Sequence, residues 1–100
     1  MEYFMIKHIV LFDFKEENRE ENIKKAKEML LALMGSVPSL RKMEVGINFS
    51  KEERAMDLSI YTEFDDVAGL EEYAVHPEHL KVVEFIKTVV TGSKVSDYTV

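Results

Sequence analysis

Tyr73-Ala-Val-His76-Pro77-Glu78-His79 is the stretch around which the fold is organised, because it joins two patterns of helical spacing. Proline suits the first turn of a helix and not its interior, so one helix ends near His76 and the next begins at Pro77. The apolar residues of the second helix fall within one arc, and His79 lies at its centre. They are Val82, Val83, Ile86, Val89 and Val90. An ionisable ring there needs a partner, loses its charge or borders a cavity. A functional site is therefore expected near His79.

Two further helices are predicted before this stretch. Residues 16–34 carry apolar side chains at helical spacing, glutamates in the first turns and Gly35 as a stop. Asp65 and Asp66 form an N-cap pair for a short helix that runs to about Val75. Tyr73 lies at the margin of the apolar face of that short helix. Its hydroxyl is therefore expected to border a pocket.

Four segments alternate between apolar and polar residues, as strands with one buried face do. They are residues 4–14, 40–49, 56–64 and 95–100, and Thr91-Gly92-Ser93 is expected to close the last helix. The first strand places His8 on its apolar face. The order β-α-β-β-α-β, with a helix pair in the second helical position, predicts an α+β protein with a four-stranded antiparallel sheet and helices on one face.

The other face of this sheet has no predicted cover. Met5, Ile9, Leu11 and Tyr61 lie there among charged residues. An exposed patch of that size usually marks a partner surface. Self-association into a homodimer through the sheet is therefore expected.

The composition narrows the class of protein. One hundred residues make a single domain, residues 1–100, and no apolar run approaches the roughly 20 residues needed to cross a bilayer. Met1-Glu-Tyr-Phe-Met has no basic region, which favours a strand over a signal peptide. The net charge of −6 argues against nucleic acid as a partner. The absence of cysteine is consistent with a cytoplasmic protein.

Four segments resemble the stress-responsive A/B barrel (Dabb) family. They are Ile6–Lys15, Pro38-x-Leu40 with Gly46, Tyr73-x-x-His76-Pro-x-His79 with Val82-Val83, and Asp97-Tyr98. The resemblance covers nearly the whole chain, and its HPxH element with an upstream tyrosine is fairly specific. It implies a ferredoxin-like protomer that dimerises sheet to sheet into an α+β barrel, and a link to stress response.

The resemblance also implies roles for single residues. In a plant polyketide cyclase of the family, the residues matching His79 and Tyr73 act as general base and assisting tyrosine, without a cofactor. The residue matching His8 borders the cyclase pocket, and where the cyclase has a further pocket histidine this chain carries Leu58. The predicted pocket lies between the sheet and the helices. Its expected lining is His8, Val10, Leu58, Ile60, Val83 and Ile86.

Each histidine also has a structural interpretation. His79 could be a buried residue that is hydrogen-bonded to backbone or to Tyr73 and fixes the helix junction. His76 is typical of an N-cap or turn residue, and His8 of a satisfied core histidine. A metal site is not predicted, because His76 and His79 would diverge and no third ligand lies nearby in the chain.

Three functions follow from these alternatives. The first is a dimeric domain that binds a small apolar or aromatic carbonyl compound, with neither nucleic acid nor membrane as a partner. The second is a cofactor-free, cyclase- or lyase-like enzyme with His79 as base and Tyr73 as donor. The third is a structural, stress-related oligomer. Related barrels that oxidise quinols or degrade haem are more distant, and no feature of this sequence singles out their chemistry.

Overall fold

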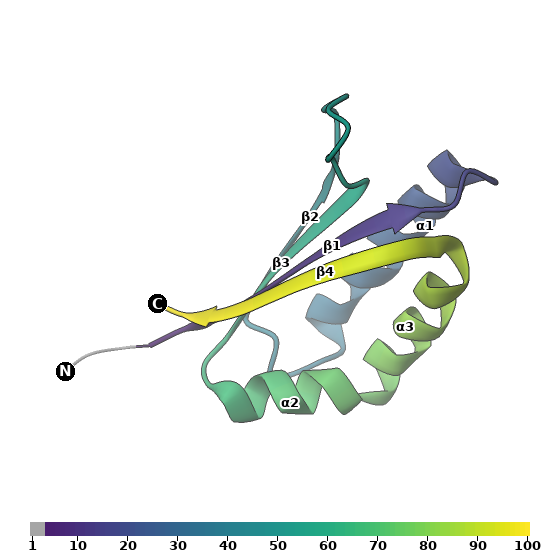
Figure 1. Cartoon of the computed structure of the whole chain (residues 1–100). Helices are drawn as coiled ribbons and strands as arrows, with labels where there is room; N and C mark the ends of the chain where they lie inside the picture. Colours follow the sequence, from purple (N-terminus) through teal and green to yellow (C-terminus); the bar gives the residue numbers. More distant parts are fainter. Residues whose placement is uncertain (1–3) are drawn as a thin grey trace.

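A four-stranded antiparallel sheet carries its helices on one face (Figure 1). The computed structural model describes residues 4–100; residues 1–3, part of the opening predicted to be a strand and not a signal peptide, lie outside this range. The elements are β1 (Ile6–Phe14), α1 (Arg19–Leu31), the 3-10 helix η1 (Ala32–Gly35), β2 (Lys42–Ile47), β3 (Leu58–Phe64), α2 (Val67–Val75), α3 (Pro77–Val89) and β4 (Val90–Thr99). The predicted fold class is confirmed.

The sheet has the strand order β2-β3-β1-β4, so β1 and β3 are central and β4 is an edge strand. His8 of β1 lies opposite Thr62 of β3 on one side and Asp97 of β4 on the other. Successive residues of a strand point to opposite faces. The register therefore places Asp97 on the same face as His8, towards the helices.

The junction between α2 and α3 follows the sequence pattern closely. The Asp66 side chain accepts a hydrogen bond from the backbone N–H of Gly69 at the start of α2. The His76 side chain accepts one from the backbone N–H of Glu78 at 3.1 Å and so caps α3. His76 is thus an N-cap, as the structural interpretation predicts, and its backbone is extended because a proline follows.

Two predicted boundaries need correction. The helix expected over residues 16–34 begins at Arg19, after Asn18 adopts a left-handed conformation, and tightens after Leu31 into η1, which includes Gly35. Thr91-Gly92-Ser93 does not close the last helix: α3 ends at Val89, and these residues belong to β4. The reason is pairing, since Gly92 and Ser93 lie opposite Asp13 and Phe12 in the ladder with β1.

The core lies between the sheet and the helices. Its most deeply buried large side chains include Phe14, Leu58 and Phe64, and the Thr62 hydroxyl donates a 2.8 Å hydrogen bond to the carbonyl of His8. Along β4 the helical cover is thinner, because Val95 faces the helix side but is 63% exposed. A cavity beside this edge strand can therefore open to solvent. Within residues 4–100, no helix is long and apolar enough to cross a membrane.

Candidate functional site

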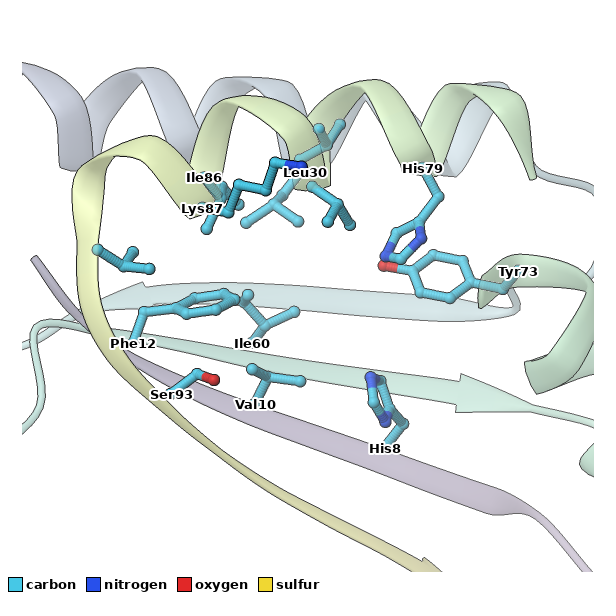
Figure 2. A pocket seen from close by; sticks show the side chains of 13 residues that line it. His8, Val10, Phe12, Leu30, Ile60, Tyr73, His79, Ile86, Lys87 and Ser93 are labelled. Atoms are coloured by element: carbon cyan, nitrogen blue, oxygen red, sulfur yellow. The ribbon is translucent and has the colours of Figure 1, made fainter. Parts of the chain in front are cut away.

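A pocket of about 240 Å³ lies between the helix-facing side of β1 and β4 and the helices α2 and α3 (Figure 2). Val10, Ile60 and Ile86 give it apolar walls, and Leu30 of α1 also lines it. His8, Tyr73 and His79 gather at one end, which we call the histidine end. Phe12, Ser93 and Lys87 lie toward the other, the lysine end.

His79 is held by the backbone of the preceding helix. Its Nδ1 lies 3.1 Å from the carbonyl oxygen of Ala74. A carbonyl only accepts hydrogen bonds, so Nδ1 carries the proton and Nε2 of the neutral ring keeps a free lone pair. Burial lowers the pKa of His79, and the nearby imidazoles of His8 and His76 lower it further, against the opposing effect of the Ala74 hydrogen bond. The ring is therefore neutral near pH 7.

Tyr73 presents a phenol to the same end of the pocket. The residue is 3% exposed, and its ring centroid lies 4.2 Å from that of His79 and 5.1 Å from that of Phe64. Figure 2 shows its hydroxyl alongside the imidazole of His79. Among residues 4–100 the hydroxyl has no hydrogen-bond partner. Burial raises the pKa of Tyr73, so the phenol stays protonated and can donate a hydrogen bond.

His8 completes the histidine end from the sheet. Its ring centroid lies 6.4 Å from that of Tyr73, and its Nδ1 is paired with the carboxylate of Asp97. Asp97 is a site residue to which the sequence analysis gave no role. The alternation of the last strand was the available signal for the side of the sheet on which Asp97 lies. Its pairing with His8 depends on the β1–β4 register.

The structure gathers most of the predicted pocket residues around this one cavity. His8, Val10, Ile60, Val83 and Ile86 line it together with Tyr73 and His79. Leu58 does not line the cavity: it is fully buried at the start of β3, opposite Phe12 and Ile47. Phe12 lies between Leu58 and Ser93 in the sheet and lines the pocket in place of Leu58.

Several lining residues were missed by the sequence analysis. Lys87 was not singled out from the sequence, and Ser93 was assigned to a helix end. Val82 was recognised only as a member of an apolar helix face, and Phe12 was not singled out within its strand. His76, which caps α3, does not line the pocket. In the described part of the chain, no three histidine or carboxylate side chains are placed to share a metal ion.

Together these residues make a mostly apolar cavity with a neutral base and a phenol donor at one end. A low-polarity site strengthens hydrogen bonds to a bound polar group. The arrangement can hold a small molecule whose carbonyl or hydroxyl oxygen meets Tyr73, and it can move a proton to or from Nε2 of His79.

The fold and this site define a class, the ferredoxin-like α+β proteins with a histidine–tyrosine pocket between sheet and helices. Within that class, the chain belongs to the stress responsive A/B barrel domain (Dabb) family, whose sequence model matches residues 6–100. The resemblance noted from the sequence is thereby confirmed.

Solved structures agree with this membership. A dimeric protein of unknown function with a ferredoxin-like fold from Bacteroides fragilis is 31% identical, over 94% of each chain, with a TM-score of 0.86. A dimeric ferredoxin-like protein of unknown function from Thermobifida fusca is 18% identical, over 100% of this chain and 94% of its own, with a TM-score of 0.87. A hydroxynitrile lyase from Passiflora edulis is 18% identical, over 96% and 93%, with a TM-score of 0.85. The latter two show the fold alone. No curated protein matches this sequence.

Proposed function

We propose that this chain is a homodimeric domain that binds a small apolar or aromatic carbonyl compound in the pocket beside His79 and Tyr73. One observation carries the proposal: Tyr73 is 3% exposed on the wall of an open cavity, and no group within residues 4–100 accepts a hydrogen bond from its hydroxyl. A phenol O–H that lines a mostly apolar cavity and has no acceptor in the described part of the chain is available to donate to a bound molecule. A carbonyl oxygen of a ligand would supply that acceptor.

The size and lining of the cavity limit the ligand. Ligand pockets usually span about 300–1,000 Å³, and this one measures about 240 Å³. It therefore suits a compound with a single ring or a short chain. The apolar walls formed by Val10, Ile60 and Ile86 favour a hydrocarbon body, and the histidine end favours a neutral oxygen.

The proposed dimer uses the face of the sheet opposite the helices, which we call the outer face (Lys7, Ile9, Leu11, Tyr61 and Glu63). Lys7 Nζ contacts the Tyr61 hydroxyl and lies 2.9 Å from Glu63 Oε2, while the Tyr61 hydroxyl donates to Glu63 at 2.5 Å. The charges of Lys7 and Glu63 are thus paired with each other, beside apolar Ile9 and Leu11. The relatives from Bacteroides and Thermobifida are dimeric, which supports the same for this chain.

The test is an NMR titration of the His79 ring with a panel of small aromatic ketones and aldehydes. Binding is expected to shift the His79 signals in the wild type and to weaken roughly tenfold in Tyr73→Phe, which removes only the donor. Tyr98→Phe, on the exposed edge strand, is the matched control and should bind as the wild type does. If no compound perturbs His79, or if both variants bind equally well, the proposal is wrong and a structural oligomer becomes the better reading.

A second candidate is a cofactor-free enzyme, and the geometry of His79 favours it. The free Nε2 lone pair can take a proton from the carbon next to a bound carbonyl, while the electron pair of the broken C–H bond moves onto the carbonyl oxygen. The Tyr73 hydroxyl can donate to that oxygen as negative charge develops. The protein from Passiflora edulis that shares this fold is named a hydroxynitrile lyase, so the fold also occurs in an enzyme.

This enzymatic candidate can be tested without a known substrate. In deuterated water, a bound ketone should exchange its α-protons for deuterium faster with the wild type than with His79→Gln, while both proteins still bind it. Equal exchange rates would leave ligand binding as the function.

A cytoplasmic location remains a prediction from the lack of cysteine, and cell fractionation would check it.

A further inference from the structure

The two ends of the pocket differ in charge. At the histidine end, the polar groups are the neutral His79, the phenol of Tyr73 and the His8–Asp97 pair. At the lysine end, the polar groups are the Lys87 ammonium on α3 and the Ser93 hydroxyl on β4. These two donors come from two of the elements that line the pocket, and both residues are exposed.

Lys87 differs from the other lysine of its helix. Lys81 lies 3.0 Å from Glu78 and forms an i,i+3 ion pair. Within residues 4–100, Lys87 forms no ion pair with any carboxylate and instead lines the pocket. Its position in the last turn complements the helix dipole, but that effect needs no contact with a cavity. Figure 2 shows its side chain beside Ile86, across the pocket from Phe12.

We propose, building on the ligand-binding function above, that the ligand is an amphipathic carboxylate held in one direction. Its carboxylate meets Lys87 and Ser93 at the opening, its apolar body lies against Val10, Ile60 and Ile86, and its neutral oxygen reaches Tyr73. The reverse direction would bring a carboxylate towards Asp97, and like charges repel. The charge pattern therefore fixes both the class of ligand and its orientation.

The spacing of the two ends sets the length of the ligand. Lys87 follows His79 by eight residues along α3, which is about 12 Å at the helical rise of about 1.5 Å per residue. The Lys87 side chain can fold back over the opening, as long lysine stems do on apolar surface. A hydroxyphenyl or oxo-acyl carboxylate with one ring or a short chain fits between the two ends.

The experiment compares matched pairs of probes that differ only in charge, such as para-hydroxyphenylpropionate and its methyl ester, by calorimetry and by the NMR shifts of His79. The acid should bind the wild-type protein more tightly than the ester. Lys87→Gln should weaken the acid about three- to tenfold and leave the ester unchanged, because it removes a charge-assisted contact at an exposed site. Lys87→Arg should retain the preference for the acid.

Lys81→Gln is the matched control, because it removes a charge of the same sign from the same helix away from the pocket. If the acid and the ester bind equally, or if Lys81→Gln weakens the acid as much as Lys87→Gln does, the anion preference is wrong and ligand binding still stands. If neither probe nor any member of the carbonyl panel perturbs His79, the ligand-binding function itself fails.

Discussion

The imidazole of His79 lies 4.2 Å from the phenol ring of Tyr73, centroid to centroid, although the two residues belong to different helices. Pro77 makes this approach possible, because it ends α2 and starts α3 in a new direction just after His76. The same break leaves the carbonyl of Ala74 free to accept from His79 Nδ1. One junction thus sets both the position of the base and its tautomer.

Stability should depend on pH through His79. Burial lowers its pKa in the folded state, so the unfolded chain binds a proton that the folded chain does not as pH falls below the unfolded value of about 6.5. The free energy of unfolding therefore contains the whole His79 contribution above that pH and loses it as the pH falls below that value. Urea denaturation followed at about pH 7.5 and about pH 5.5 should show this loss in the wild type.

His79→Gln should reduce that pH-dependent loss, because glutamine does not titrate. Tyr73→Phe is the control, since it changes the ring beside His79 and leaves all three imidazoles in place. A His79→Gln variant with the full wild-type pH dependence would show that this ring is not the group that takes up the proton.

The hydroxyls of Thr62 and Tyr73, two residues near His8, should respond in different ways to removal. Thr62→Val deletes a hydroxyl that donates to the His8 carbonyl at 2.8 Å and should cost about 1 kcal/mol of the free energy of unfolding. Tyr73→Phe deletes a hydroxyl without a partner in residues 4–100 and should leave that free energy unchanged or raised. Thermal melts of the unliganded proteins would check this, and a large loss in Tyr73→Phe would mean that the hydroxyl is satisfied.

The sequence predicts the histidine end of the pocket better than the lysine end. His79 and Tyr73 are found from spacing around a proline, because helical periodicity and the break act over a few residues. Asp97 and Ser93 depend on how β4 pairs with β1, and that register is long-range. The error at Thr91-Gly92-Ser93 shows the same limit, since glycine after an apolar helix resembles a C-terminal stop until the pairing of Gly92 with Asp13 is known.

Lys87 was missed for a different reason. A helical wheel treats each residue as a direction from the axis, and Lys87 points away from the centre of the apolar arc. Its stem is long enough to cover neighbouring apolar surface while the ammonium stays in solvent. Whether such a lysine is a solvated residue or part of a pocket opening depends on the strand facing it, here β4.

A charge placed on the outer face should break the proposed dimer. Ile9 lies opposite Tyr61 of β3 and Ser96 of β4, on the side of the sheet away from the helices. Ile9→Lys should therefore preserve the protomer but bury an unpaired charge in the sheet-to-sheet contact, which costs several kcal/mol. Sedimentation at micromolar concentration should show a dimer for the wild type and a monomer for the variant.

Val67→Lys provides the comparison, because Val67 is an exposed residue of α2 away from the outer face. It should remain dimeric. A monomeric wild type, or an Ile9→Lys variant that stays dimeric, would show that the sheet face is not the contact.

Truncating Leu58 should mainly lower stability, whereas truncating Val83 should mainly change ligand affinity. Leu58 is fully buried beside Phe12 and outside the cavity, so Leu58→Ala should cost about 2–5 kcal/mol of the free energy of unfolding. Val83 is 39% exposed and lines the cavity, so Val83→Ala should cost less than about 1 kcal/mol while enlarging the opening. Urea denaturation measures the first difference, and the carbonyl panel measures the second through changed affinity. If Leu58→Ala altered the affinity as Val83→Ala does, with its fold intact, Leu58 would belong to the pocket wall and the cavity would extend deeper along β3.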